Sequence, residues 1–132
     1  MNRGPNSPGG VFSNLLPRDL AEKVRLVVLD VDGVLTDSGV YLGALPDGQP
    51  LEMKRFDIQD GLGIRFLQWG GIEVAIVSGR VSEATAIRAR ELDITECHHD
   101  GGAQKIRAIQ GILDRLGLDW DQVAMLADDL PD

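Results

Sequence analysis

Positive charge, cysteine and long apolar runs are all scarce in this chain of 132 residues. Its 13 lysine and arginine residues face 21 acidic ones, so the formal net charge is −8, whereas nucleic-acid binding usually needs a basic surface. A single cysteine, Cys97, cannot form an internal disulfide. The longest apolar runs have the length of a strand, too short to cross a bilayer, and no secretion signal stands at the N-terminus. These shortages predict a cytoplasmic protein that binds neither nucleic acid nor membrane.

What remains is ordinary for a globular protein, with 43% hydrophobic and 26% charged residues. The length allows one domain. Residues 1–22 are rich in glycine, proline, asparagine and serine, which predicts a flexible N-terminal leader. We therefore expect the folded domain to occupy residues 23–132.

Strand-like and helix-like segments alternate along that domain. The expected strands are residues 24–29, 73–77, 94–97 and 122–126, and the expected helices are 60–69, 82–92 and 103–116. This alternation predicts an α/β fold, a three-layer Rossmann-like parallel sheet with helices on both faces. A small β-hairpin, residues 39–42 and 51–56 around a Pro-Asp-Gly turn, is expected as an insertion. Phe66 and Trp69 are expected in the core, and His98 and His99 in a loop after the third strand.

Two carboxylates, Asp30 and Asp32, come directly after the first expected strand. Side chains two positions apart in an extended chain point the same way, so both can face one cavity. Carboxylates this close repel each other unless a cation neutralises them or one keeps its proton. Such a pair suits phosphoryl transfer, in which one carboxylate attacks and the other exchanges protons, with Mg²⁺ as the cation. The alternative is a solvated turn with no ligand.

Three later features favour the chemical interpretation. Ser78-Gly79-Arg80 follows the second strand, and its hydroxyl could bind a phosphate oxygen, although serine and glycine also occur in ordinary connections. Lys105 lies near the start of a helix, where its charge could balance the acids. Asp128 and Asp129 follow the last strand. The carboxyl ends of parallel strands meet at one edge, so these groups are expected to converge.

Together the motifs DVDGVLTD, VSGR, Lys105 and ADDLPD resemble, in this order, those of the haloacid dehalogenase-like hydrolases. The segment KRFDIQDGLGI at 54–64 makes the chain more narrowly similar to the 3-deoxy-D-manno-octulosonate 8-phosphate phosphatase family. The resemblance runs from residue 24 to the C-terminus. Members of that family continue beyond the fourth motif, so the resemblance implies that C-terminal elements are missing here. The short hairpin resembles the arrangement in those members that have no large cap domain.

The resemblance also implies roles for individual residues. Asp30 is expected to be the nucleophile, Asp32 the general acid and base, Ser78 a phosphate ligand and Lys105 their charge partner. Mg²⁺ is expected on Asp30, Asp32 (through its main-chain carbonyl) and Asp128, with Asp129 orienting metal-bound water. The residues expected to bind the sugar phosphate are Asp32, Asp57, Ile58, Gln59, Asp60, Gly61, Arg65, Arg80, Arg88 and Lys105.

The resulting expectation is a magnesium-dependent phosphatase that hydrolyses a sugar-acid phosphate through an aspartyl-phosphate. Guanidinium groups suit such a ligand because they bind carboxylate or phosphate through two hydrogen bonds, although Arg65 and Arg88 lie in helical stretches and could be ordinary surface residues. The resemblance further implies a homotetramer if the full-length chain is present. The alternatives are a non-catalytic domain that uses the same pocket for binding or assembly, and a phospho-accepting receiver domain.

Overall fold

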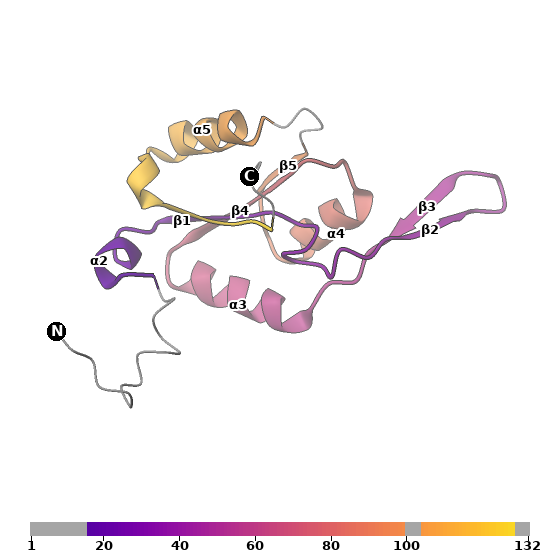
Figure 1. Cartoon of the computed structure of the whole chain (residues 1–132), viewed down its shortest axis with the longest axis horizontal. Coiled ribbons are helices and arrows are strands. Elements are labelled where there is room, and N and C mark those ends of the chain that lie inside the picture. Colours follow the sequence, from indigo (N-terminus) through magenta and orange to yellow (C-terminus); the bar gives the residue numbers. More distant parts are fainter. Residues whose placement is uncertain (1–15, 100–103, 129–132) are drawn as a thin grey trace, which may run out of the picture.

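A computed structural model describes residues 16–99 and 104–128 of the chain. Its centre is a parallel sheet of four strands in the order β5-β4-β1-β6 (Figure 1). The strands are β1 (Leu26–Leu29), β4 (Glu73–Ser78), β5 (Glu96–His99) and β6 (Val123–Leu126). The expected parallel α/β fold is confirmed.

Helices cover both faces of this sheet, as the sequence predicts (Figure 1). On one face lie α3 (Ile58–Trp69) and α4 (Glu83–Glu91), and on the other lies α5 (Lys105–Leu116). A short 3₁₀ helix, η1 (Trp120–Gln122), leads into β6. Within the segment predicted as a leader, α2 (Arg18–Ala21) forms one exposed helical turn, and residues 1–15 lie outside the described part of the chain.

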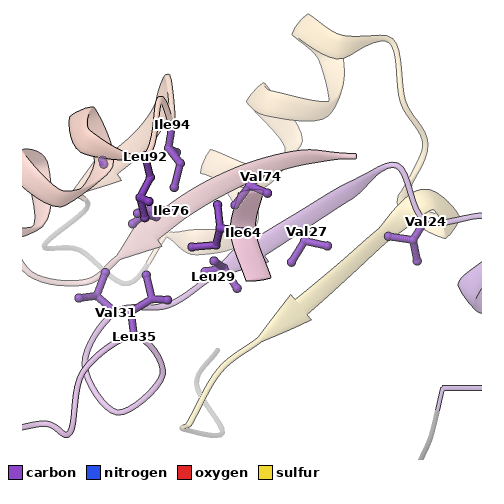
Figure 2. Close-up of a cluster of buried hydrophobic side chains, with 11 residues drawn as sticks. Val24, Val27, Leu29, Val31, Leu35, Ile64, Val74, Ile76, Leu92 and Ile94 are labelled. Carbon is purple, nitrogen blue, oxygen red and sulfur yellow. The ribbon is translucent and has the colours of Figure 1, made fainter. Parts of the chain in front are cut away.

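Strand β1 supplies the centre of the core because each of its residues is buried. Val27 and Leu29 pack toward α3 and α4, and Figure 2 shows them with Ile64 of α3 and Ile76 of β4. Leu26 and Val28 point to the opposite face, toward α5. A strand that is apolar on both faces is typical of a parallel sheet covered by helices. This burial fixes the position of the residues that follow β1.

The expected hairpin forms from β2 (Tyr41–Ala44) and β3 (Pro50–Met53), which pair antiparallel. It projects from the body of the molecule in Figure 1. An isolated bridge between Thr36 and Phe56 fastens its base beside the loop that follows β1. The hairpin therefore starts and ends at the tip of the central strand.

Two expectations about side chains are wrong. Phe66 and Trp69 are 59% and 74% exposed and contact each other edge to face at 5.6 Å. The core position of α3 is taken by Ile64 instead. His98 and His99 belong to β5 rather than to a loop, because β5 begins and ends two residues later than expected. In the described part of the chain, no helix is long and apolar enough to cross a membrane.

Candidate active site

The carboxyl ends of β1, β4 and β6 lie next to one another at one edge of the sheet. Leu29 of β1 is level with Ile76 of β4 and Leu126 of β6. The backbone N–H of Asp30 donates to the Leu126 carbonyl at 3.0 Å, which continues the ladder one step beyond β1. The structure thus brings Asp30, Ser78 and Asp128 to the same edge, within two residues of this common level.

Asp30 is buried and paired with a buried lysine. Its carboxylate Oδ1 accepts from the Val31 backbone N–H at 2.7 Å, and its Oδ2 lies 3.4 Å from Nζ of Lys105. Both side chains are 10% exposed. Lys105 is the first residue of α5, on the face of the sheet opposite to α3. Pairing with a cation offsets the free-energy cost of burying a carboxylate, and the fixed orientation of this carboxylate suits a nucleophile.

The turn after β1 brings Asp128 to the same loop. Gly33 adopts φ +82°, and a Cβ at this position would overlap the carboxylate of Asp128 and lie 2.9 Å from the Ser38 hydroxyl. The Asp128 carboxylate therefore lies against the backbone immediately after Asp32. Glycine is favoured here, because the conformation is left-handed and any Cβ would displace the Asp128 carboxylate.

This arrangement fits the donor set expected for Mg²⁺. Mg²⁺ takes oxygen ligands from one or two carboxylates together with waters and phosphate oxygens. The carboxylates of Asp30 and Asp128 and the carbonyl of Asp32 come from two adjacent strand ends. Among residues 16–99 and 104–128, no cluster of three or more His, Cys, Asp or Glu side chains is placed to hold a metal. The expected set needs only two such side chains. Asp129, expected to orient metal-bound water, lies outside the described residues.

Asp32 pairs with a residue that the sequence analysis missed. Its Oδ1 accepts from Nζ of Lys54 at 2.9 Å, and the Lys54 side chain is fully buried. Lys54 directly follows β3, so this ion pair also fastens the hairpin to the tip of β1. Lysine is almost never fully buried without a partner, which makes the pair specific. The sequence did contain a signal for this contact, because Lys54 lies two residues after Glu52 in the strand expected at residues 51–56.

Ser78 ends β4 in a buried position and shapes the connection to α4. Its Oγ accepts from the Arg80 backbone N–H at 3.3 Å. Arg80 in turn donates through Nη2 to Glu52 of β3 at 3.2 Å. The same carboxylate accepts from the Ser82 hydroxyl at 2.7 Å. The loop between β4 and α4 is therefore fastened to the hairpin, as is the loop after β1.

The start of α3 packs beside the loop after β1. Asp57 caps the helix, since its side chain accepts from the Gln59 backbone N–H at 2.8 Å. The Asp57 carbonyl accepts from Nη2 of Arg88 at 3.0 Å, and a Cβ on Gly61 would lie 2.7 Å from that nitrogen. Ile58 and Asp60 are exposed. The structure thus brings the expected segment 57–61 and Arg88 together, and the Arg88 guanidinium donates a hydrogen bond to that segment.

Arg65 is the expected binding residue that the structure does not bring to this edge. Its Nη1 contacts Asp93 at 2.7 Å, and its Nη2 donates to the Glu91 carbonyl at 2.9 Å. These partners lie at the connection from α4 to β5, at the opposite end of the strands. Within one chain, Arg65 joins α3 to α4.

The sequence is similar to those of curated phosphatases. No protein-family model matches the chain. A 3-deoxy-D-manno-octulosonate 8-phosphate phosphatase from Escherichia coli K12 is 40% identical over 112 residues, which are 85% of this chain and 57% of that protein. The Yersinia pestis protein with the same description is 38% identical over 124 residues, 94% of this chain and 63% of that protein. The chain thus spans less than two thirds of the length of these relatives.

Solved structures agree with this similarity. The phosphatase of that description from Moraxella catarrhalis, in complex with magnesium, phosphate and KDO, has a TM-score of 0.76 and 37% identity and matches 86% of this chain and 63% of its own. The cobalt-bound phosphatase from Haemophilus influenzae has a TM-score of 0.73 and 34% identity, over 86% of this chain and 63% of its own.

The parallel sheet with acids at adjacent strand ends, a buried lysine beside the first acid and a hairpin in place of a large insertion define a haloacid dehalogenase-like domain. Over the part of those proteins that it spans, the chain is similar in sequence and in fold to 3-deoxy-D-manno-octulosonate 8-phosphate phosphatases.

Proposed function

We propose that this domain hydrolyses the phosphate ester of a small sugar acid, similar to 3-deoxy-D-manno-octulosonate 8-phosphate, with Mg²⁺ as cofactor and Asp30 as nucleophile. The observation that supports this most strongly is the buried pair of Asp30 and Lys105 at the tip of the central strand. The names of the relatives, and the magnesium, phosphate and KDO bound to one of them, support the substrate class.

In the proposed reaction, the Asp30 carboxylate attacks the phosphorus atom. An oxygen–phosphorus bond forms as the ester bond to the sugar breaks, and the protonated carboxyl of Asp32 gives its proton to the departing sugar oxygen. Asp32, now ionised, takes a proton from the water that cleaves the aspartyl-phosphate. Phosphate leaves and Asp30 is restored. Lys54 keeps the Asp32 side chain directed at this point.

Ser78 and Lys105 are proposed to bind the phosphate oxygens, and Arg80 the sugar acid. The carboxylates of Asp30 and Asp128 and the carbonyl of Asp32 would hold Mg²⁺, which when bound offsets negative charge on the phosphate and the acids. The segment 57–61 and Arg88 are proposed as further substrate contacts.

The test is phosphate release from a panel of sugar phosphates with and without Mg²⁺, for the wild type and for Asp30→Asn. An amide is a poor nucleophile, so we expect turnover to fall by about 10³-fold or more while the fold is retained. Asp121→Asn, an exposed change in η1, is the control and should keep its activity. Undiminished release by folded Asp30→Asn would refute the role of Asp30.

We also propose that the protein assembles as a homotetramer through the hairpin. Exposed apolar side chains on it, namely Tyr41, Leu42 and Met53 at 63%, 79% and 53% exposure, support this assembly. Exposed apolar patches are typical of interaction sites. Sedimentation of the full-length protein should show a tetramer, and an active monomer would contradict the proposal.

A further inference from the structure

Strand β3 and Lys54, the residue directly after it, present alternate side chains to two different loops of the site. Glu52 and Lys54 point inward, whereas Leu51 and Met53 are 38% and 53% exposed. Lys54 contacts Asp32 after β1, and Glu52 contacts the connection between β4 and α4. Because side chains alternate along an extended chain, Glu52 and Lys54 lie on the same face and hold both loops.

The carboxylate of Glu52 binds two groups of different kinds. Its Oε1 accepts from the Ser82 hydroxyl at 2.7 Å, and its Oε2 accepts from Nη2 of Arg80 at 3.2 Å. Ser82 is the buried N-cap of α4, and its Oγ accepts from the Thr85 backbone N–H. The N-cap is therefore part of a chain of hydrogen bonds that fixes where α4 begins. Arg80 lies two residues before this cap, so Glu52 fixes the guanidinium relative to the helix.

An acid at this position needs an explanation, because it lies near a proposed site for an anionic substrate. A carboxylate would repel phosphate or a sugar carboxylate unless its charge is compensated. Arg80 compensates it through one terminal nitrogen. A guanidinium has five N–H donors in a rigid fork, so one contact leaves donors for a second anion. The contact with Glu52 can thus orient Arg80 and still leave guanidinium N–H donors for the substrate.

We propose that Glu52 is a positioning residue that directs the Arg80 guanidinium at the anionic group of the substrate. This inference rests on the proposed phosphatase function. It assigns the hairpin a role in the geometry of its own subunit's site, through a residue that touches Arg80 and Ser82 rather than substrate.

The variant Glu52→Gln separates positioning from folding, because the amide oxygen still accepts from Ser82 while the charge beside Arg80 is lost. In the full-length protein with Mg²⁺, we expect KM for a carboxylated sugar phosphate to rise about tenfold, the scale of one charge-assisted hydrogen bond, with kcat within about twofold. A sugar phosphate without a carboxylate identifies the anion. A rise for the carboxylated substrate alone assigns Arg80 to the carboxylate, and a rise for both assigns it to the phosphate.

The matched control is Glu73→Gln, an exposed glutamate at the opposite end of β4, which should leave both KM values unchanged. Unchanged KM values for Glu52→Gln with both substrates would overturn the inference.

Amide hydrogen exchange tests the positioning role of Glu52 independently of turnover. We expect the amides of residues 79–81, around Arg80, to exchange about tenfold faster in Glu52→Gln than in wild type or Glu73→Gln, because the charged contact that holds Arg80 is lost while the contact to Ser82 remains. Equal exchange rates in all three proteins would overturn the positioning role. A wild type that releases no phosphate from any substrate would refute the proposed function, and the exchange rates would still test Glu52.

Discussion

Replacing Gly33 by alanine is expected to weaken Mg²⁺ binding more than it weakens the fold. Gly33 has φ +82°, a left-handed conformation that costs an alanine about 1–2 kcal/mol. Part of this cost is offset, by about 0.4–1 kcal/mol, because alanine restricts the unfolded chain more than glycine does. The backbone alone should therefore lower the free energy of unfolding by about 1 kcal/mol.

The larger effect comes from the space that the new methyl group would occupy. Its Cβ would lie 2.8 Å from Cγ of Asp128, so the carboxylate must move. Asp128 is exposed, and it can rotate toward solvent at little cost to folding. It then leaves the position proposed for a metal ligand. Disturbing the orientation of a ligand typically costs about 10–100-fold in metal affinity, or about 1.4–2.8 kcal/mol of binding free energy.

Gly71→Ala is the matched control because Gly71 has nearly the same conformation, φ +79°, but open space around its Cβ position. Urea unfolding should show similar losses of stability for the two variants. Calorimetric titration with Mg²⁺ should show weaker binding for Gly33→Ala alone. Equal Mg²⁺ affinity in Gly33→Ala and wild type would refute the placement of Asp128 in the metal site. An equal loss in Gly71→Ala would attribute the effect to backbone strain.

Three further changes test other parts of the site and the fold. Lys54→Met should lower kcat and reduce the free energy of unfolding by about 1–3 kcal/mol, because it leaves the Asp32 carboxylate without its buried partner; an unchanged kcat in the phosphate-release assay would contradict the role of Lys54. The hydrogen bond from Arg115 lowers the pKa of Glu96 from 4.5 to about 2, so its stabilisation is present above about pH 4.5 and is lost as the pH falls toward 2. Glu96→Gln should accordingly lower the melting temperature at about pH 6 and have little effect near pH 2, whereas an equal effect at both pH values would contradict this pairing. Removing Mg²⁺ with a chelator should abolish turnover in the same assay and leave the helical circular dichroism unchanged, and turnover that persists would exclude a metal requirement.

The strand ends were predictable because each acid or hydroxyl follows an apolar run, and parallel strands share one edge for their carboxyl ends. The start of α3 was missed by two residues, since Asp57 caps the helix and the apolar pattern becomes clear only later. Phe66 and Trp69 were misplaced for a related reason. Helix α3 carries apolar residues on two faces, and periodicity does not show which one meets the sheet; Ile64 does.

The partners supplied by the hairpin could not be predicted from local patterns. Lys54 meets a residue 22 positions earlier, and Glu52 meets one 30 positions later. Such contacts depend on how the hairpin packs against the rest of the protein. The bridge between Thr36 and Phe56 fixes the base of the hairpin. The alternation of Leu51, Glu52, Met53 and Lys54 indicated two faces of a strand but not what each face touches.

The charges gathered at the strand ends explain why a divalent cation and the hairpin belong to the same proposal. Once Asp32 has given up its proton, Asp30, Asp32 and Asp128 contribute three negative charges, and Lys105 and Lys54 contribute two positive ones, which leaves one negative charge without counting the phosphate. Of these two lysines, one starts α5 and the other comes from the hairpin. A phosphate ester would add up to two more negative charges, so the lysines alone cannot balance the occupied site. Mg²⁺ on Asp30 and Asp128 would offset the two charges of the phosphate and return the net charge to −1, and Lys54 would then serve mainly to keep Asp32 directed at the sugar oxygen.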